Sequence, residues 1–249
     1  MKKSQNKLNI KKIIKWGCIG AVVIFLAVVV TRYFTTYHAA EESVSAYLNG
    51  NGQDGVKVSE TEWGFFIDGP GKDNAVVFYP GCKVENEAYI PMFYNLAKEG
   101  YDCLMINVPL RHAVFGKNSG DAVMKQYNYK KWLFAGHSMG GMAISDFAAS
   151  KADEIDGVIL LGAHATKKLY DKNVKVLSMY GDKDTVVNKK AVSKDRENLG
   201  KNFVEYVING GNHAGWAYYG VQAMDSPAEI SQEKQQQLGI EKILETFGK

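Results

Sequence analysis

Hydrophobic and polar positions along residues 63–249 predict strands that alternate with helices. Short, nearly continuous apolar runs are typical of strands buried on both faces, and longer amphipathic segments separate them. The strand-like runs are WGFFI (63–67), NAVVFY (74–79), YDCLMINVP (101–109), KWLFA (131–135), GVILLG (157–162), VKVLSMYG (174–181) and NFVEYVING (202–210). The helix-like segments are AYIPMFYNLAKEG (88–100), AVMKQY (122–127), MGGMAISDFAASKA (139–152), NKKAVSKDRENLG (188–200) and SQEKQQQLGIEKILETF (231–247). This order predicts an α/β fold with a mostly parallel, doubly wound sheet and helices on both faces. Ligands of such sheets bind beyond the carboxyl ends of the strands.

The N-terminal part follows a different pattern. Residues 13–30 are apolar apart from Lys15, and at about 1.5 Å per residue they cover about 27 Å, close to the thickness of a bilayer core. We predict a basic cytoplasmic tail at 1–12, a transmembrane signal anchor at 13–31, a juxtamembrane and Gly-rich connector at 32–62, and the catalytic domain at 63–249. Five lysines precede the run and only Arg32 closely follows it, which favours a cytoplasmic N-terminus and an extracytoplasmic body at the cell membrane. A cleaved signal peptide is the alternative, although the first pair of small residues after the run is as late as Ala39–Ala40.

Composition and charge narrow the class of protein. The chain has 249 residues, 46% of them hydrophobic and 23% charged, which suits one large folded domain and excludes general disorder. The formal charge of +3 comes from the N-terminus, because residues 1–44 carry seven basic and two acidic groups. The rest of the chain is slightly acidic and offers no basic footprint for nucleic acid. Cys82 and Cys103 could form one bridge in an oxidising compartment, but we expect two ordinary small side chains.

A serine lies between glycines in FAGHSMGGMA (134–143), directly after a predicted strand and directly before a predicted helix. This is the strand–turn–helix context of a nucleophile elbow, in which Ser138 occupies a strained turn and projects its hydroxyl. The simpler interpretation is that Gly136 and Gly140 only allow the strand to turn into a helix. A serine also needs a base, and the base needs a carboxylate that orients it.

The chain order on such a fold is serine, acid, histidine. Of the five histidines, only His213, in the loop INGGNHAGW, follows both Ser138 and the next candidate acids. The acid comes from GDKDTVV after the run 174–181, where we prefer Asp184 and keep Asp182 as the alternative. One of the two is expected to bond only its own turn.

An oxyanion hole takes one N–H from the residue after the nucleophile, here Met139, and a second from the loop after an earlier strand. The loop YPGCKVENEAY (79–89) places Cys82 best for this, unless Pro80-Gly81 is a simple turn. The segment PLRHAVFGKNSGDAV (109–123) is expected to line the substrate side with Arg111 and His112; Arg111 holds an anionic group or is an ordinary surface arginine. Trp216 is expected to form an aromatic wall there or to seat the loop.

The motifs YPGCKVENEAY, GHSMGG, YGDKDTVV and GGNHAGWAYYG together resemble the α/β-hydrolase superfamily, in particular its small bacterial fold-5 branch, over about residues 63–247. The resemblance implies a Ser-Asp-His triad of Ser138, Asp184 and His213, oxyanion donors at Cys82 and Met139, and no lid domain. Relatives often read Pro-Gly-Gly where this chain has Pro80-Gly81-Cys82, so a bulkier residue flanks the hole.

We therefore expect a membrane-anchored serine hydrolase, most consistent with a carboxylic ester hydrolase that works through an acyl-enzyme on a small-molecule ester or acyl substrate. Two alternatives remain: an amide or peptide hydrolase of cell-envelope material, and a non-catalytic binding module on the same fold. No cofactor or metal is expected, since no His/Cys cluster has the spacing of metal ligands. The sequence leaves the oligomeric state open.

Overall fold

The computed structural model describes residues 2–49, 53–116, 118–169, 174–200 and 202–248. The chain divides into two units, residues 1–36 and 37–249, which are described separately.

The first unit contains the helix α1 (Lys2–Thr35). Its segment Lys12–Thr35 has 24 residues and a mean hydropathy of 2.6, and none of this segment is buried by protein. At about 1.5 Å per residue it extends about 36 Å, enough to cross the hydrocarbon core of a bilayer. A signal sequence would have the same length and composition. The helix continues past the predicted end of the apolar run at Val30 as far as Thr35.

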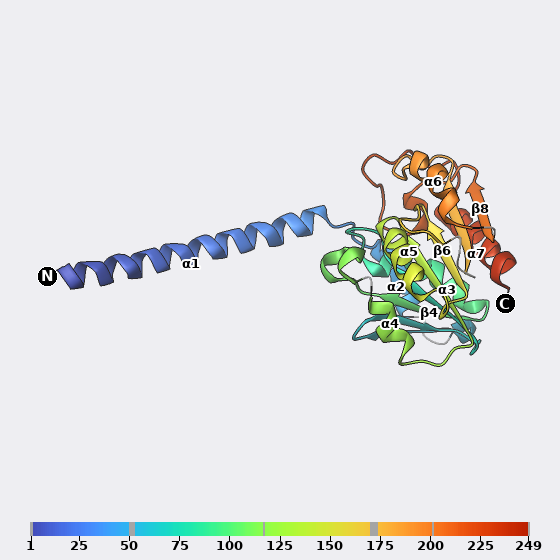
Figure 1. Ribbon diagram of the computed structural model, residues 1–249, viewed down its shortest axis with the longest axis horizontal. Helices are drawn as coiled ribbons and strands as arrows, with labels where there is room; N and C mark the ends of the chain where they lie inside the picture. Colours follow the sequence, from blue (N-terminus) through green and yellow to red (C-terminus); the bar gives the residue numbers. More distant parts are fainter. Residues whose placement is uncertain (1, 50–52, 117, 170–173, 201, 249) are drawn as a thin grey trace. The chain divides into compact units, whose positions relative to one another are not determined.

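The second unit is built on one eight-stranded sheet in the order β1-β2-β4-β3-β5-β6-β7-β8 (Figure 1). The antiparallel pairs β1–β2 and β2–β4 form one end of the sheet, and the pairs from β4 through β3 to β8 are parallel. The strands are β1 (Lys57–Thr61), β2 (Gly64–Asp68), β3 (Asn74–Tyr79), β4 (Tyr101–Ile106), β5 (Lys131–His137), β6 (Gly157–Leu161), β7 (Lys175–Gly181) and β8 (Phe203–Ile208). The predicted α/β fold with a mostly parallel sheet is confirmed.

Helices cover both faces of this sheet because successive side chains of a strand point to opposite faces. In β3, for example, Val76 and Phe78 join the core cluster that contains α2, α3 and α7, whereas Ala75 and Val77 join the cluster that contains α4 and α5. The helices of this unit are α2 (Glu41–Asn49), α3 (Ile90–Lys98), α4 (Ser119–Met124), α5 (Met139–Lys151), α6 (Lys189–Asp195) and α7 (Gln232–Phe247). Short 3₁₀ turns are η1 (Gln53–Gly55), η2 (Asn86–Tyr89), η3 (Pro109–Arg111), η4 (Ala113–Gly116), η5 (Arg196–Asn198) and η6 (Ala214–Trp216).

The compact unit begins at Tyr37, and α2 and β1 lie within the segment 32–62 that the sequence analysis expects to be a connector. Helix α2 packs Val44 into the core with 2% of its surface exposed, and Tyr47 makes an edge contact with Tyr94 of α3 at 5.1 Å between ring centroids. Strand β1 pairs with β2 in antiparallel register. Neither element has an apolar run of its own, so tertiary packing rather than local pattern stabilises them.

Replacing Val44 by alanine tests whether this segment belongs to the folded domain. We expect Val44→Ala to lower the free energy of unfolding of the full chain in detergent by about 2 kcal/mol, since two buried carbons are lost and a cavity remains. Val207→Ala is the matched control, because Val207 of β8 is 44% exposed. Equal thermal stability of the two variants would mean that α2 does not contribute to the fold.

Candidate active site

Ser138 occupies the sharp turn between β5 and α5. Its backbone has φ 53° and ψ −120°, a conformation in the left-handed half of φ space that L-residues seldom adopt. The turn is tight because a Cβ at Gly136 would lie 2.5 Å from the backbone of Gly140 and Gly141, and a Cβ at Gly140 would lie 2.2 Å from the carbonyl oxygen of Tyr79. Glycine is therefore sterically required at both positions. The sequence prediction of a strand–turn–helix corner at Ser138 agrees with this geometry.

His213 and Asp184 meet at the same edge of the sheet, from the loops after β8 and β7. Nδ1 of His213 lies 2.8 Å from Oδ2 of Asp184, and the two side chains are 1% and 0% exposed. The other carboxylate oxygen, Oδ1, accepts the backbone N–H groups of Val186 at 2.9 Å and Val187 at 2.8 Å. Since an ionised carboxylate only accepts, Nδ1 carries the proton and Nε2 of a neutral ring is left as a bare acceptor.

Asp182, the alternative acid, turns to a different partner. Its Oδ1 accepts the N–H of Gly210 at 2.6 Å, and its Oδ2 lies 3.7 Å from the Lys183 ammonium. Asp182 thus braces the start of the loop that carries His213, while Asp184 contacts the imidazole itself.

The turn at Ser138 and the His213–Asp184 pair both lie beside the end of β6, and His137 packs next to the pair. The N–H of Ser138 donates to the carbonyl of Leu161 at 2.9 Å. A Cβ on the next residue, Gly162, would lie 3.0 Å from Nδ1 of His213 and 3.1 Å from Oδ2 of Asp184. The hydroxyl of Ser138 makes no hydrogen bond with His213, whose Nε2 is buried without a hydrogen-bond partner among the described residues.

The ring of His137 packs against the ring of His213, a contact that the sequence analysis did not predict. Its ring centroid lies 4.5 Å from that of His213, and its Nδ1 lies 2.8 Å from the hydroxyl of Tyr89. The ring is fully buried, and burial together with the nearby His213 ring lowers the pKa of His137 well below its usual 6.5. His137 is therefore neutral in the folded protein at neutral pH, and no charge on it competes with His213.

This lowered pKa predicts a loss of stability in mild acid. The unfolded chain takes up a proton on His137 below about pH 6.5 while the folded chain does not, so unfolding becomes easier by up to about 1.4 kcal/mol per pH unit as the pH falls. We expect His137→Gln to lose less unfolding free energy between pH 7 and pH 5.5 than the wild type. The half-exposed His112→Gln should keep the wild-type pH dependence. Parallel pH profiles for wild type and His137→Gln would contradict the assignment.

The loop after β3 brings Cys82 to the same edge of the sheet. Gly81 donates its N–H to the Tyr89 hydroxyl at 3.1 Å, whereas the N–H groups of Cys82 and Met139 make no hydrogen bond with the described part of the chain. Met139 opens α5, where the first amides lack intrahelical partners and carry the positive end of the helix dipole. The Cys82 thiol lies 3.2 Å from Nδ1 of His112, and burial raises its pKa, so the thiol stays protonated. Cys82 and Cys103 are both free.

The three residues expected to line the substrate side lie in three different environments. Arg111 lies beside the Cys82 loop, but its guanidinium pairs with Glu85 at 3.0 Å and its carbonyl accepts the Lys83 N–H at 2.9 Å. His112 is half-buried beside the Cys82 thiol. Trp216 forms no wall toward solvent: it is fully buried in the core against Gly239 of α7, so it seats the loop that carries His213.

Gln235 of α7 holds the backbone of the His213 loop. Its Oε1 accepts the Asn212 N–H at 2.9 Å and its Nε2 donates to the Asn212 carbonyl at 2.8 Å, with the side chain fully buried. Nothing in the polar stretch QEKQQQ distinguishes Gln235 from its neighbours, so the sequence carried no signal for this contact.

A second histidine–aspartate pair lies on the α6 side of the sheet edge. Nδ1 of His164 is 2.7 Å from Oδ2 of Asp195, and both side chains are partly exposed. This pair ties the loop after β6 to α6. In the described part of the chain, no group of three or more His, Cys, Asp or Glu side chains is arranged as metal ligands.

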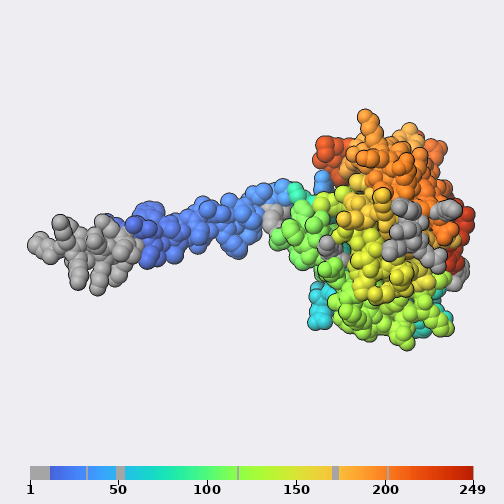
Figure 2. Space-filling model, viewed as in Figure 1, coloured from blue at the N-terminus to red at the C-terminus, as the bar shows by residue number. Residues whose placement is uncertain are grey.

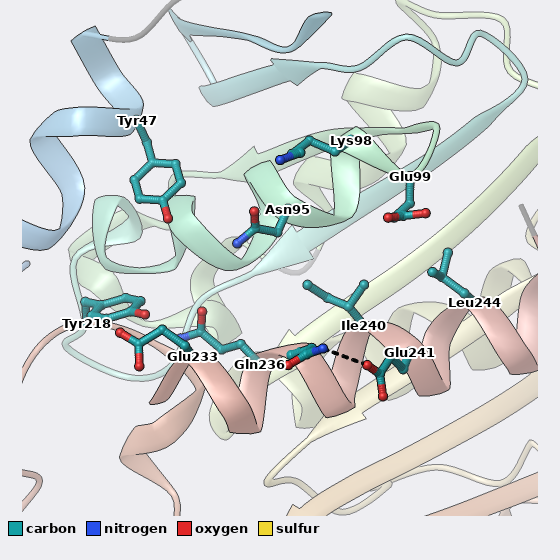
Figure 3. A pocket seen from close by; sticks show the side chains of 11 residues that line it. Tyr47, Asn95, Lys98, Glu99, Tyr218, Glu233, Gln236, Ile240, Glu241 and Leu244 are labelled. Atoms are coloured by element: carbon teal, nitrogen blue, oxygen red, sulfur yellow. Dashed lines mark hydrogen bonds between the residues drawn. The ribbon is translucent and has the colours of Figure 1, made fainter. Parts of the chain in front are cut away.

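A separate hollow of about 290 Å³ lies between α2, α3 and α7 (Figure 3). Figure 3 shows Tyr47 and Tyr218 at one end and Leu244 at the other. Within α7, Gln237 donates to Glu241 at 2.9 Å. The other lining residues of the hollow are Asn95, Lys98, Glu99, Glu233, Gln236 and Ile240. It contains neither Ser138 nor the His213–Asp184 pair.

Comparison with known proteins agrees with this fold. The model of the alpha/beta hydrolase family matches residues 75–237, which include Ser138, Asp184 and His213. No curated protein sequence matches the chain.

Solved structures with the same fold include a predicted CIB-like hydrolase of Thermoplasma acidophilum, with 16% identity, a TM-score of 0.56 and coverage of 76% of this chain and 99% of that one. Est1E of Butyrivibrio proteoclasticus, solved with ferulic acid bound, has 18% identity and a TM-score of 0.56, with 79% and 98% covered. The hydrolase MGS-MChE2, from a lagoon-sediment metagenome, has 14% identity and a TM-score of 0.58, with 76% and 98% covered. The family match extends over about two thirds of the chain, and the sheet order and helix positions are those of the same fold. The chain therefore belongs to the alpha/beta hydrolase family, in its fold-5 branch.

Proposed function

We propose that this hydrolase is a serine esterase in which Ser138, His213 and Asp184 form the triad. The observation that carries the proposal is the buried His213–Asp184 pair, whose ring is oriented by the 2.8 Å contact at Nδ1 and whose Nε2 has no partner among the described residues. A buried polar atom without a partner costs stability and therefore calls for a functional reason. A nitrogen held ready to accept a proton from a serine is such a reason.

In the proposed reaction, His213 Nε2 removes the proton from Ser138 Oγ as this oxygen attacks the acyl carbon. Asp184 keeps the proton on Nδ1 and stabilises the imidazolium that forms. The amides of Cys82 and Met139 stabilise the oxyanion, each contributing about 10²–10³ in rate. His213 then gives its proton to the leaving alcohol, and water releases the acyl group from Ser138 by the same steps.

Ester substrates are preferred over the alternatives for two reasons. Est1E, one of the proteins of the same fold, holds ferulic acid, and a carboxylic acid is one product of ester hydrolysis. A binding module without catalysis would gain nothing from burying an imidazole in this orientation. An amide or peptide hydrolase would use the same side chains, and a panel of p-nitrophenyl esters beside peptide anilides separates these two activities.

We also propose that α1 anchors the enzyme in the cell membrane, with the N-terminal lysines in the cytoplasm and the catalytic unit outside. The 24-residue apolar segment and the excess of lysines before it support this orientation.

Covalent labelling tests the nucleophile. We expect a fluorophosphonate probe to label the full-length protein at Ser138, and Ser138→Ala to lose labelling and about 10³-fold or more of kcat, because the attacking oxygen is absent. Ser150→Ala, an exposed serine of the same helix, is the control and should behave like the wild type. Labelling that persists in Ser138→Ala would refute the assignment.

A pair of aspartate variants tests the acid. Asp184→Asn is expected to lower kcat by about 10³–10⁴-fold, because the amide no longer holds His213 in the productive tautomer. Asp182→Asn should change kcat little, because the asparagine oxygen still accepts the Gly210 N–H. Steady-state kinetics on a short p-nitrophenyl ester measures both. Equal losses in the two variants would remove Asp184 from the triad.

A further inference from the structure

Large apolar side chains are exposed on two loops beside the candidate active site. Outside α1, six such side chains are exposed in the described part of the chain, and five of them lie on the segments 108–116 and 218–225. Their exposed fractions are 57% for Leu110, 55% for Val114, 64% for Phe115, 89% for Val221 and 85% for Met224. We call these five residues the apolar rim. Figure 2 shows green atoms, from the middle of the sequence, projecting from the surface of the folded unit. Exposed apolar side chains that lie near one another mark an interaction surface, and the two loops are linked through Lys83 and Tyr37, which bond to Arg111 and Ala223.

The two loops of the apolar rim come from different parts of the chain, and each is bonded to a different loop of the candidate site. Segment 108–116 carries His112, which contacts the Cys82 thiol, and Arg111, which accepts the Lys83 N–H at 2.9 Å. Segment 218–225 follows the His213 loop, and its Asp225 accepts the N–H of Ala214 at 2.9 Å. The rim is therefore fixed to both the proposed oxyanion loop and the loop of the proposed base.

Residues 37–40 contact both the loop of Cys82 and the segment 218–225. Tyr37 donates its N–H to the Lys83 carbonyl at 2.9 Å and accepts the Glu85 N–H at 3.0 Å. Its ring lies 5.3 Å from that of Tyr219, and its hydroxyl accepts the Ala223 N–H at 3.3 Å.

Glu85 secures the same segment with its side chain. It accepts the Ala39 N–H at 3.0 Å, and its other oxygen lies 3.0 Å from His38 and from Arg111. The segment 37–40 is thus attached to the catalytic unit by backbone and side-chain bonds rather than acting as a spacer.

Chain connectivity then limits how far the site can lie from the anchor. The apolar helix ends at Thr35, and only Thr36 precedes Tyr37. Two residues span at most about 7 Å, so Tyr37 lies within that distance of the last helical residue in any orientation of the helix. Because the folded unit begins at Tyr37, the chain has no long tether between that unit and the end of α1.

We propose that the apolar rim docks into the outer surface of the bilayer that holds α1, and that the substrate is an acyl ester embedded in that bilayer. This inference rests on the proposed esterase function and anchor. Transfer of five large apolar side chains out of water favours docking. A lipid-like ester then reaches Ser138 without its acyl chain passing through water.

Fluorescence quenching tests docking independently of catalysis. We use full-length protein in vesicles of phosphatidylcholine and phosphatidylglycerol, with Trp16→Phe to remove the tryptophan of α1 and Val221→Trp as the reporter. The spectrum of the Trp16→Phe parent, which keeps Trp63, Trp132 and Trp216, is subtracted to leave the emission of residue 221. Docking predicts a blue-shifted emission from residue 221 that is lost when brominated phosphatidylcholine replaces the ordinary lipid. Val207→Trp, at the sixth exposed position on β8, should show neither change. Unquenched emission from residue 221 would overturn docking, and a blue shift without quenching would indicate a protein partner or a second copy instead.

Kinetics in the same vesicles tests the substrate class. The double variant Val221→Ser, Met224→Asn should lose about tenfold in the rate on a long-chain acyl ester embedded in the bilayer, as the removal of two large apolar contacts implies. Its kcat/KM for a short soluble ester should match the wild type, and Val207→Ser should change neither rate. Equal effects on both substrates, or no effect on either, would refute the inference. If wild type hydrolyses neither ester, the esterase proposal fails, while the quenching result still decides docking.

Discussion

The hydrogen bond between Asp184 and His213 is the interaction on which the rest of this site depends. Burying a carboxylate is costly unless it is paired and hydrogen-bonded, and here Nδ1–H of His213 and two backbone amides satisfy it. Two loops that follow different strands must meet within 2.8 Å for this bond to form. Gly162 leaves room for the pair, and Gln235 holds the backbone of the histidine loop from α7. The strands of the sheet, the helix α7 and the turn at Ser138 all place side chains or backbone beside that contact.

The Nε2 nitrogen of His213 is buried at a cost in stability that its proposed role as the base would explain. A buried acceptor without a partner costs about 1–3 kcal/mol, and Nε2 of His213 is one such atom in the described chain. The neighbouring imidazole of His137 avoids a second charge, because burial lowers its pKa and Tyr89 occupies its Nδ1. Within one cluster, one histidine is thus held neutral by its surroundings while the other is oriented by its bond to Asp184.

The segment 37–40 is bonded to two loops of the folded unit that carries the candidate site. Tyr37 extends the loop of Cys82 by backbone pairing and packs on Tyr219 beyond the histidine loop. A segment expected to separate a soluble domain from a membrane instead forms part of the rim of the candidate site.

The sequence by itself determined the alternation of buried strands and helices and the corner at Ser138, because periodicity and close-packed glycines are local properties. Chain order also selected His213, and the position of Asp184 after β7 made it a candidate. Only the tertiary structure decided that Asp184 rather than Asp182 contacts the ring, since both carboxylates lie in one short turn and differ in direction. It likewise decided the roles of Trp216, Gln235 and residues 37–49 and 53–62, whose packing depends on partners far away in the chain that no local pattern encodes.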